Sequence, residues 1–185
     1  MAALEFAILA PMLVLLLLGG TDLTFWYLKK FRLDNAAAAV GNIVAAQTSL
    51  ALTAFPANYC STTSTATNYF AVASELSLPM TVCGTGGATI ISGLSNNGTT
   101  TTVAWQERTG SSASFPSLFG TVGSTPTLPP GYSVPSNHNV IATELYSDVT
   151  TWSTPVQTII GAAGSNVLYS YTLFEPRTGQ LATPQ

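Results

Sequence analysis

The most regular feature of the chain is an apolar run at its beginning. From Phe6 to Leu28 the only charged residue is Asp22, and a helix needs about 20 apolar residues to cross a bilayer. We therefore predict that this segment spans a membrane. A cleaved secretory signal is disfavoured, because such signals start with positive residues and no Lys or Arg precedes Lys29. An ordinary signal anchor stays open as an alternative.

Helical periodicity continues beyond this run. Small and apolar residues recur there at spacings of three and four, which is the pattern of a helix with one packing face. These residues are Leu33, Ala36, Ala37, Val40, Ile43 and Val44, and the polar Gln47 continues the same spacing. We predict one continuous helix from near Met1 to about Leu50, roughly 75 Å long at about 1.5 Å per residue. Its first half has to be buried in lipid or in other subunits.

Pro11 and the Gly19-Gly20 pair weaken this helix locally. Proline lacks a backbone N–H, and glycine adds backbone freedom. Membrane helices tolerate both residues, so we interpret them as tolerated kinks. The alternative is a segment that stretches or melts when the helix moves from lipid into a polymer.

After Leu50 the chain changes character, and Ser, Thr, Gly and Pro become frequent. We divide the chain into a membrane and assembly helix over residues 1–50 and a small β-rich domain over residues 51–185. Strands are predicted at residues 88–94, 100–106, 140–146 and 167–174, which are rich in β-branched or aromatic residues. Asn97-Gly98 predicts a hairpin between the first two strands.

The Pro-rich and Gly-rich residues 121–139 predict an irregular loop on the surface. The predicted fold class is therefore α+β, with a long amino-terminal helix and a small carboxy-terminal antiparallel sheet packed on its outer half.

Cys60 and Cys83 are the only cysteines, and both lie in the predicted exported domain. An even count in an oxidising compartment predicts a disulfide. Closing this loop stabilises a fold by about 3.5 kcal/mol in the chain-entropy model. Two buried free thiols are the alternative.

The remaining composition offers little chemistry. Five basic residues face eight acidic ones, for a net charge of −3, and three of the five bases are Lys29, Lys30 and Arg32 beside the apolar run. No basic surface is left on the domain for nucleic acid. His138 is the only histidine, so one chain cannot build a multi-histidine metal site or a pair of acid-base histidines. We predict no enzyme activity, no metal site and no cofactor.

Glu5 places a carboxylate at the head of the apolar run. At the centre of a bilayer such a charge costs about 2.5–3.5 kcal/mol, and less near a helix end. The first turn of a helix favours an acid by only about 0.3–1 kcal/mol. We therefore expect a cation from elsewhere to pair with Glu5.

The beginning of the chain resembles a known family. The pattern is Leu4-Glu5-Phe6-Ala7, Pro11, a leucine run, Gly19-Gly20, Asp22, Phe25-Trp26-Tyr27 and then Arg32-Leu33-Asp34-Asn35-Ala36-Ala37. It is similar to the amino-terminal helix of TadE-like pilins and pseudopilins of the Tad/Flp-type system, within the type IV pilin class. The resemblance is close over roughly the first 50 residues, and its most specific element is the acid at the fifth position followed by Phe.

The resemblance implies how this helix is processed and assembled. In that family a prepilin peptidase removes a short basic leader, so Met1 corresponds to the processed terminus of a mature chain. Glu5 then pairs with the free amine of Met1 on a neighbouring subunit, which supplies the missing cation. Phe6, Pro11 and Asp22 complete the set of assembly residues that the resemblance implies.

Lys29, Lys30 and Arg32 form a basic collar after the apolar run. By the positive-inside rule these residues place their end of the helix in the cytoplasm, which opposes an exported domain. A removed leader rich in Lys and Arg would restore the balance. The collar either pairs with Asp22 or Asp34 of adjacent helices or is solvated at the level of the lipid headgroups.

The predicted function is that of a structural subunit of a Tad-type pilus, polymerising through its amino-terminal helix as a main or minor pilin in adhesion or secretion. The implied partners are further copies, other pilins, the assembly machinery and the prepilin peptidase. The chain would reside in the bacterial inner membrane and then in an extracellular pilus. The alternative is a membrane-anchored extracytoplasmic binding protein that stays monomeric.

Overall fold

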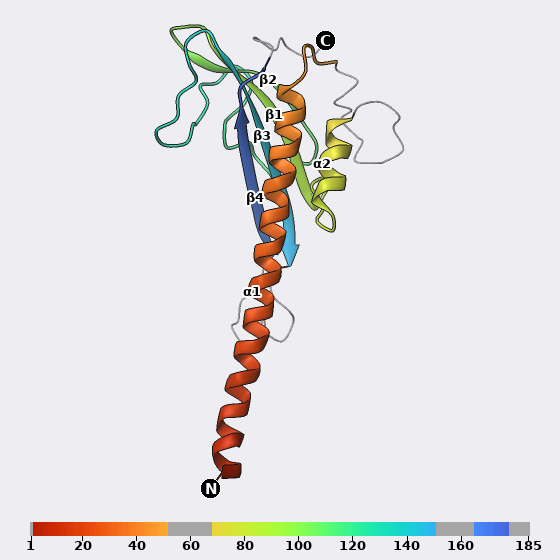
Figure 1. The fold of residues 1–185 in the computed structure, drawn as a ribbon. Helices are drawn as coiled ribbons and strands as arrows, with labels where there is room; N and C mark the ends of the chain where they lie inside the picture. The colour runs from red at the N-terminus through yellow and green to blue at the C-terminus, as the bar shows by residue number, and fades with distance from the viewer. Residues whose placement is uncertain (1, 52–67, 151–164, 178–185) are drawn as a thin grey trace.

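The structure, a computed structural model, describes residues 2–51, 68–150 and 165–177, and the side chains of residues 6–51, 68–149 and 167–177. Its longest element is helix α1, Ala2–Ala45, which extends far beyond the rest of the protein (Figure 1). The helix is continuous through Pro11 and the Gly19-Gly20 pair. It ends at Ala45 instead of near Leu50, and the Gln47 side-chain amide donates to the Ile43 carbonyl, 3.1 Å away, just after that end.

The second part of the chain contributes a four-stranded antiparallel sheet in the order β2-β1-β3-β4. The strands are β1, Gly87–Asn96, β2, Thr101–Arg108, β3, Asn139–Thr150, and β4, Ser165–Phe174. Each contains most or all of one predicted strand. At the β1–β2 hairpin, the Asn97 side chain accepts hydrogen bonds from the backbone N–H groups of Thr99 and Thr100, at 3.0 and 2.9 Å, and Gly98 has a φ of 92°. The α+β fold and the Asn-Gly hairpin are thus confirmed.

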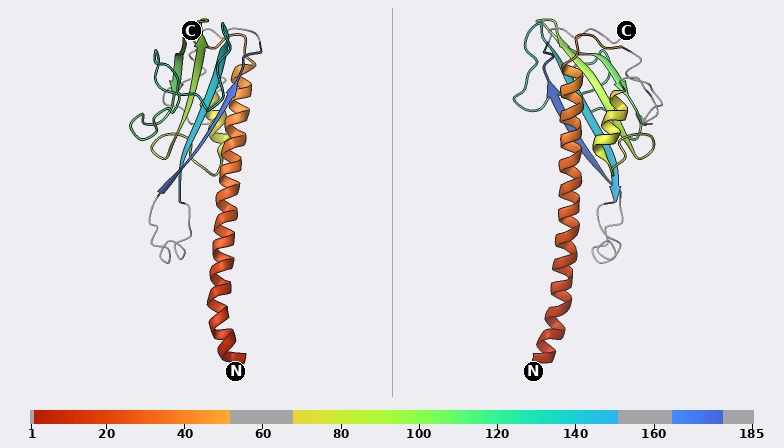
Figure 2. Two further views of the ribbon diagram at one scale, coloured as in Figure 1. Left: turned by 90° about the vertical axis from the view of Figure 1, so that its left-hand side faces the viewer. Right: turned by 45° about the vertical axis from the view of Figure 1, so that its right-hand side comes forward.

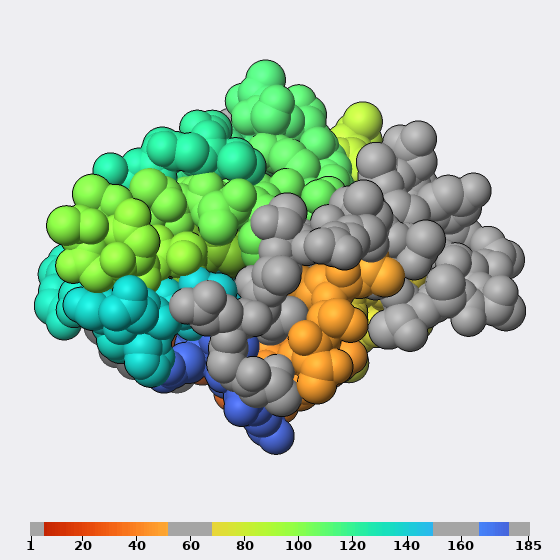
Figure 3. Space-filling model, turned by 90° about the horizontal axis from the view of Figure 1, so that it is seen from above, coloured from red at the N-terminus to blue at the C-terminus, as the bar shows by residue number. Residues whose placement is uncertain are grey.

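The sheet packs on the carboxy-terminal half of α1, as the periodicity predicted. Leu33, Ala37 and Val40 are fully buried in one core with Ile141 and Leu145 of β3. Figure 3 looks down α1 and shows its carboxy-terminal end, in orange, beside β4, in blue.

Gly41 allows a close approach of helix and sheet. A Cβ atom on Gly41 would lie 2.8 Å from Cδ2 of Phe174 and 2.9 Å from Oγ1 of Thr172. The Thr172 hydroxyl also donates to the Ala37 carbonyl at 3.0 Å, which fixes β4 against α1.

Helix α2, Tyr69–Ser77, packs beside α1 and was not predicted from the sequence. The Asn68 side chain caps it by accepting from the backbone N–H groups of Phe70 and Ala71, at 3.0 and 3.2 Å. Asparagine is among the preferred residues at this position because its side chain satisfies N–H groups that the first helical turn leaves open. Residues at three- and four-residue spacing, Tyr69, Phe70, Ala73 and Ser77, face the core.

The segment that joins β2 to β3, residues 109–138, covers the face of the sheet opposite α1. Figure 2 shows this segment, in green and teal, on one side of the sheet and α1 on the other. The predicted loop at 121–139 has no regular element before β3 begins at Asn139, but it is not only a surface feature. Val134 is buried against Leu94, Val103 and Val140, with Leu128 packed beside them. This third layer explains why the outward-facing positions of β3 are not cleanly polar.

Candidate functional site

The amino-terminal part of α1, from Phe6 to Phe31, projects away from the sheet (Figures 1 and 2); we call it the projecting half. It is long and apolar enough to cross a membrane, and the most apolar stretch of the helix has no share buried inside the protein. Leu16 is 70 % exposed and Phe6 is 69 % exposed. Apolar surface of this extent, without a partner among the residues that the structure describes, marks a site for lipid or for protein.

Two threonine side chains of the projecting half form hydrogen bonds that suit an apolar surrounding. The Thr21 hydroxyl donates to the Leu18 carbonyl, and the Thr24 hydroxyl donates to the Gly20 carbonyl, each at 2.8 Å. Both polar side chains are therefore satisfied within the helix, as a segment in lipid or in a packed helical core requires.

The predicted assembly residues lie along this half as far as the structure describes them. Phe6 and Pro11 are exposed, and Asp22 is half-buried. Glu5 lies in α1, but its side chain and the whole of Met1 fall outside the described residues, so their pairing stays a prediction.

The basic collar lies where the projecting half meets the sheet domain. Lys30 pairs with Asp34 one turn along the same helix, and Asp34 also accepts a hydrogen bond from the Ser170 hydroxyl at 2.6 Å. Arg32 donates from Nη1 to the carbonyl of Leu78, just beyond α2, at 3.1 Å. The acid that pairs with Lys30 thus belongs to the same helix. Arg32 links α1 to the end of α2, and Asp34 links α1 to β4.

Of the two cysteines in the predicted disulfide, the structure describes only Cys83. Cys83 is buried between α2 and β1, with the Thr109 hydroxyl 3.8 Å from its sulfur. Cys60 lies outside the described residues, so the pairing of these cysteines stays a prediction.

A buried polar cluster on the outer face of the sheet was not predicted. Glu144 of β3 is fully buried, and its carboxylate accepts hydrogen bonds from three donors. These donors are the Ser117 hydroxyl at 2.5 Å, the Leu118 backbone N–H at 2.9 Å and the Tyr169 hydroxyl at 2.9 Å. Burial raises the pKa of Glu144, while these hydrogen bonds and the nearby positive charge of Arg108 oppose the rise. The sequence signal was an acid among apolar residues of a strand, but its partners are more than 20 positions away.

Neighbouring side chains extend this cluster. The Tyr146 hydroxyl donates to the Pro116 carbonyl at 2.6 Å, and Arg108 donates from Nη2 to the Phe115 carbonyl at 2.8 Å. Burial and the adjacent Glu144 raise the pKa values of Tyr146 and Tyr169 above their ordinary range. The cluster therefore fixes residues 115–118 on the sheet.

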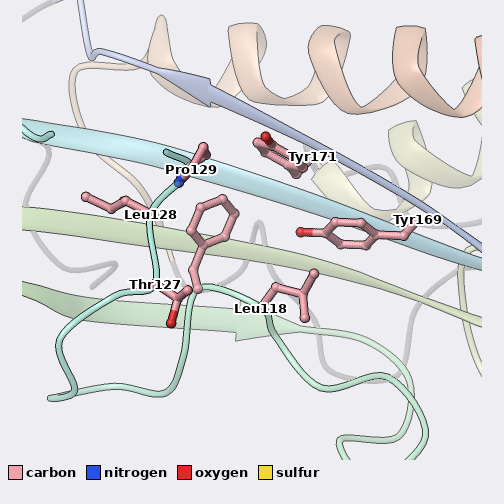
Figure 4. A pocket seen from close by; sticks show the side chains of 7 residues that line it. Leu118, Thr127, Leu128, Pro129, Tyr169 and Tyr171 are labelled. Carbon is pink, nitrogen blue, oxygen red and sulfur yellow. The ribbon is translucent and has the colours of Figure 1, made fainter. Parts of the chain in front are cut away.

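An apolar pocket of about 240 Å³ lies next to this cluster. Figure 4 shows the side chains of β4 on one side of it and those of the β2–β3 segment on the other. The pocket is lined by Leu118, Phe119, Thr127, Leu128, Pro129, Tyr169 and Tyr171. Because Glu144 binds both the Leu118 backbone and the Tyr169 hydroxyl, it holds two of the pocket walls in place.

No arrangement for metal chemistry is found in the described part of the chain, where no three His, Cys, Asp or Glu residues come together. His138 lies in the segment before β3 and pairs with Glu175, which follows β4. Arg177 donates to the Asn42 side chain of α1 at 2.9 Å.

Comparison with known proteins bears on the same part of the chain. Residues 1–41 match the family model described as TadE-like protein. No curated protein and no solved structure matches the chain. The amino-terminal 41 residues are therefore similar to TadE-like proteins, as the sequence resemblance predicted.

Proposed function

We propose that this protein is a structural subunit of a Tad-type pilus or pseudopilus that polymerises through the projecting half of α1. The observation that carries the proposal is the contrast between the two halves of one helix. The second half is buried against the sheet, whereas residues 11–17 of the first half are all exposed and present apolar side chains on every side of the helix. An all-round apolar helix needs a surrounding of lipid or of other helices.

Assembly exchanges one of these surroundings for the other. In the inner membrane, lipid covers the projecting half. In a filament, the projecting halves of neighbouring subunits cover one another, and the sheet domains form the outer surface. The prepilin peptidase, the assembly machinery and other pilins are the partners that this route requires.

In this proposal, Glu5 sets the axial position of each new subunit relative to its neighbour. Its carboxylate, near the start of α1, pairs with the amine of Met1 on a neighbouring subunit. A charge pair formed in apolar surroundings is strongly favoured over an uncompensated buried charge, because losing one partner of a buried pair costs about 3–5 kcal/mol. The pair therefore admits a new subunit only in one axial position.

The test is the Glu5→Ala variant, expressed as the full chain beside the wild type. We expect it to float with membrane vesicles as the wild type does, because removing a charge favours insertion, and to yield no filaments after shearing and pelleting. Glu5→Gln, which keeps the shape and removes the charge, should behave in the same way. Glu75→Ala, an exposed acid on α2, is the matched control and should assemble normally. Normal filaments from Glu5→Ala would refute the proposed role.

A monomeric, membrane-anchored binding protein is the second candidate, and the pocket beside Tyr169 and Tyr171 is the observation that favours it. The two candidate functions predict different assembly states of the wild-type chain. An anchored binding protein stays single in the membrane and tolerates Glu5→Ala, whereas a pilin forms filaments that depend on Glu5.

A further inference from the structure

The end of α2 lies at the boundary between the projecting half and the sheet domain. In Figure 1, α2 runs beside α1 with its carboxy-terminal end directed toward the projecting half. The hydrogen bond from Arg32 to the Leu78 carbonyl, at 3.1 Å, fixes that end against the collar. The residues that follow the last turn of α2 are thus placed at the level of Arg32.

An apolar surface surrounds this contact. Phe25, Leu28 and Arg32 are spaced by three and four residues along α1 and therefore lie on one face of the helix. Phe25 and Leu28 are exposed there. Leu78 is 55 % exposed and Leu76 is 46 % exposed at the adjoining end of α2. We call these five residues the junction patch.

The composition of the junction patch matches the boundary of a bilayer. A span from Phe6 to Leu28 measures about 34 Å at about 1.5 Å per residue, against a hydrocarbon core of about 30 Å. Arg32 then lies at the level of the headgroups, where aromatic residues anchor helices and long basic side chains reach lipid phosphates. Leu76 and Leu78 lie at the same level, although they belong to the sheet domain and not to the span.

We propose that the junction patch docks the sheet domain onto the phospholipid surface while the subunit waits in the membrane. Leu76 and Leu78 enter the boundary of the acyl chains, and Arg32, with Lys29 one turn before it, faces the phosphates. This inference rests on the proposed placement of the projecting half in a membrane. Docking fixes the orientation of the sheet domain before assembly. Extraction of the subunit into a filament then has to break the contact between the junction patch and the lipid.

The test uses the full chain at one copy per lipid nanodisc, with the photoreactive amino acid p-benzoylphenylalanine in place of Leu78 and, in a second variant, of Leu76. Both positions are exposed, so the probe leaves the core intact. Val122 is the matched control, because it is 59 % exposed. Its neighbour Gly123 is bonded to Val103, close to the β1–β2 hairpin and far from the collar. A probe at Leu16, within the span, reports insertion independently.

After illumination, mass spectrometry measures lipid adducts. We expect at least about tenfold more adduct at positions 76 and 78 than at 122. On docking, positions 76 and 78 enter a lipid layer only about 5–10 Å deep, and position 122 stays outside it. Adduct at Leu16 with no excess at 76 and 78 overturns the docking proposal alone. Absence of adduct at Leu16 overturns the membrane placement and docking together. Chain-to-chain crosslinks at 76 and 78 in discs loaded with two copies, without lipid adducts, assign the patch to a second subunit and also overturn the proposal.

Discussion

Replacing Glu144 with Ala removes the acceptor that holds the β2–β3 segment on the sheet. Three donors lose their partner in this change: the Ser117 hydroxyl, the Leu118 backbone N–H and the Tyr169 hydroxyl. Each buried group left unsatisfied costs about 1–3 kcal/mol. Arg108 also loses the negative charge that it faces. Because the side chains can partly relax, we expect a total loss of about 3–5 kcal/mol, a large share of the 5–15 kcal/mol typical of a domain.

Glu144→Gln is the matched control for this prediction. Its side-chain carbonyl can still accept from the Leu118 N–H and the Tyr169 hydroxyl, and its amide can donate to a reoriented Ser117 hydroxyl. The free energy of unfolding should therefore stay within about 1 kcal/mol of the wild type. Urea unfolding of the full chain in detergent, followed by tryptophan fluorescence, measures both variants. If Glu144→Ala unfolded within about 1 kcal/mol of the wild type, the hydrogen bonds would not hold the segment as argued.

The wild type and the Glu144→Gln variant also differ in how their stability depends on pH. Burial raises the pKa of Glu144, so the folded state binds the proton more tightly than the unfolded state, whose pKa is about 4.3. The raised pKa of Glu144 therefore contributes fully to the free energy of unfolding below about pH 4.3. This contribution is lost as the pH rises through the folded-state pKa. Glu144→Gln lacks this decline. A wild-type curve that instead rises relative to the variant over this range would reverse the assigned direction of the shift.

Three further predictions concern the contact of α1 with β4, the cap of α2 and the pairing of the cysteines. Gly41→Ala brings a Cβ atom to 2.8 Å from an aromatic carbon of β4, so we expect a net loss of about 1–2 kcal/mol in urea unfolding despite the better helix former. Gly19→Ala, with nothing within 4 Å, should cause no loss, and equal effects of the two changes would argue against the close approach. Asn68→Ala removes the cap of α2 and should cost about 1–2 kcal/mol, seen also as faster amide hydrogen exchange in α2; unchanged exchange would show that the cap is dispensable. Cys60 and Cys83 should react with an alkylating agent only after reduction, as mass spectrometry would report, and two thiols that react without reductant would exclude the disulfide.

The elements that the sequence predicted are those with local signals. Periodicity indicated α1, β-branched runs indicated the four strands, and Asn97-Gly98 indicated the hairpin between β1 and β2. Helical spacing also accounts for the pairing of Lys30 with Asp34 of its own helix, whereas the sequence suggested Asp22 or Asp34 of adjacent helices as partners of the collar. Helix α2 had a usable signal in Asn68 and the spaced residues after it, but the segment is short and adjoins a Ser/Thr-rich stretch that reads as a loop.

The features that escaped prediction depend on contacts between distant parts of the chain. The burial of Val134 and the hydrogen bonds of Glu144 to Leu118 and Tyr169 arise only when the β2–β3 segment folds back over the sheet. The link from Arg32 to Leu78 likewise joins residues 46 positions apart. For the assembly site, the sequence predicted an exposed apolar helix, but its contacts with the domain required the fold.

The central claim is that the projecting half of α1 is buried among copies of the chain. Cryo-electron microscopy of material sheared from cells that express the full chain tests it most directly. We expect filaments with the projecting halves packed in the interior, the sheet domains outside, and Glu5 beside Met1 of the neighbouring subunit. Chains found singly in lipid, with Glu5 facing water and no filament formed, would contradict the claim.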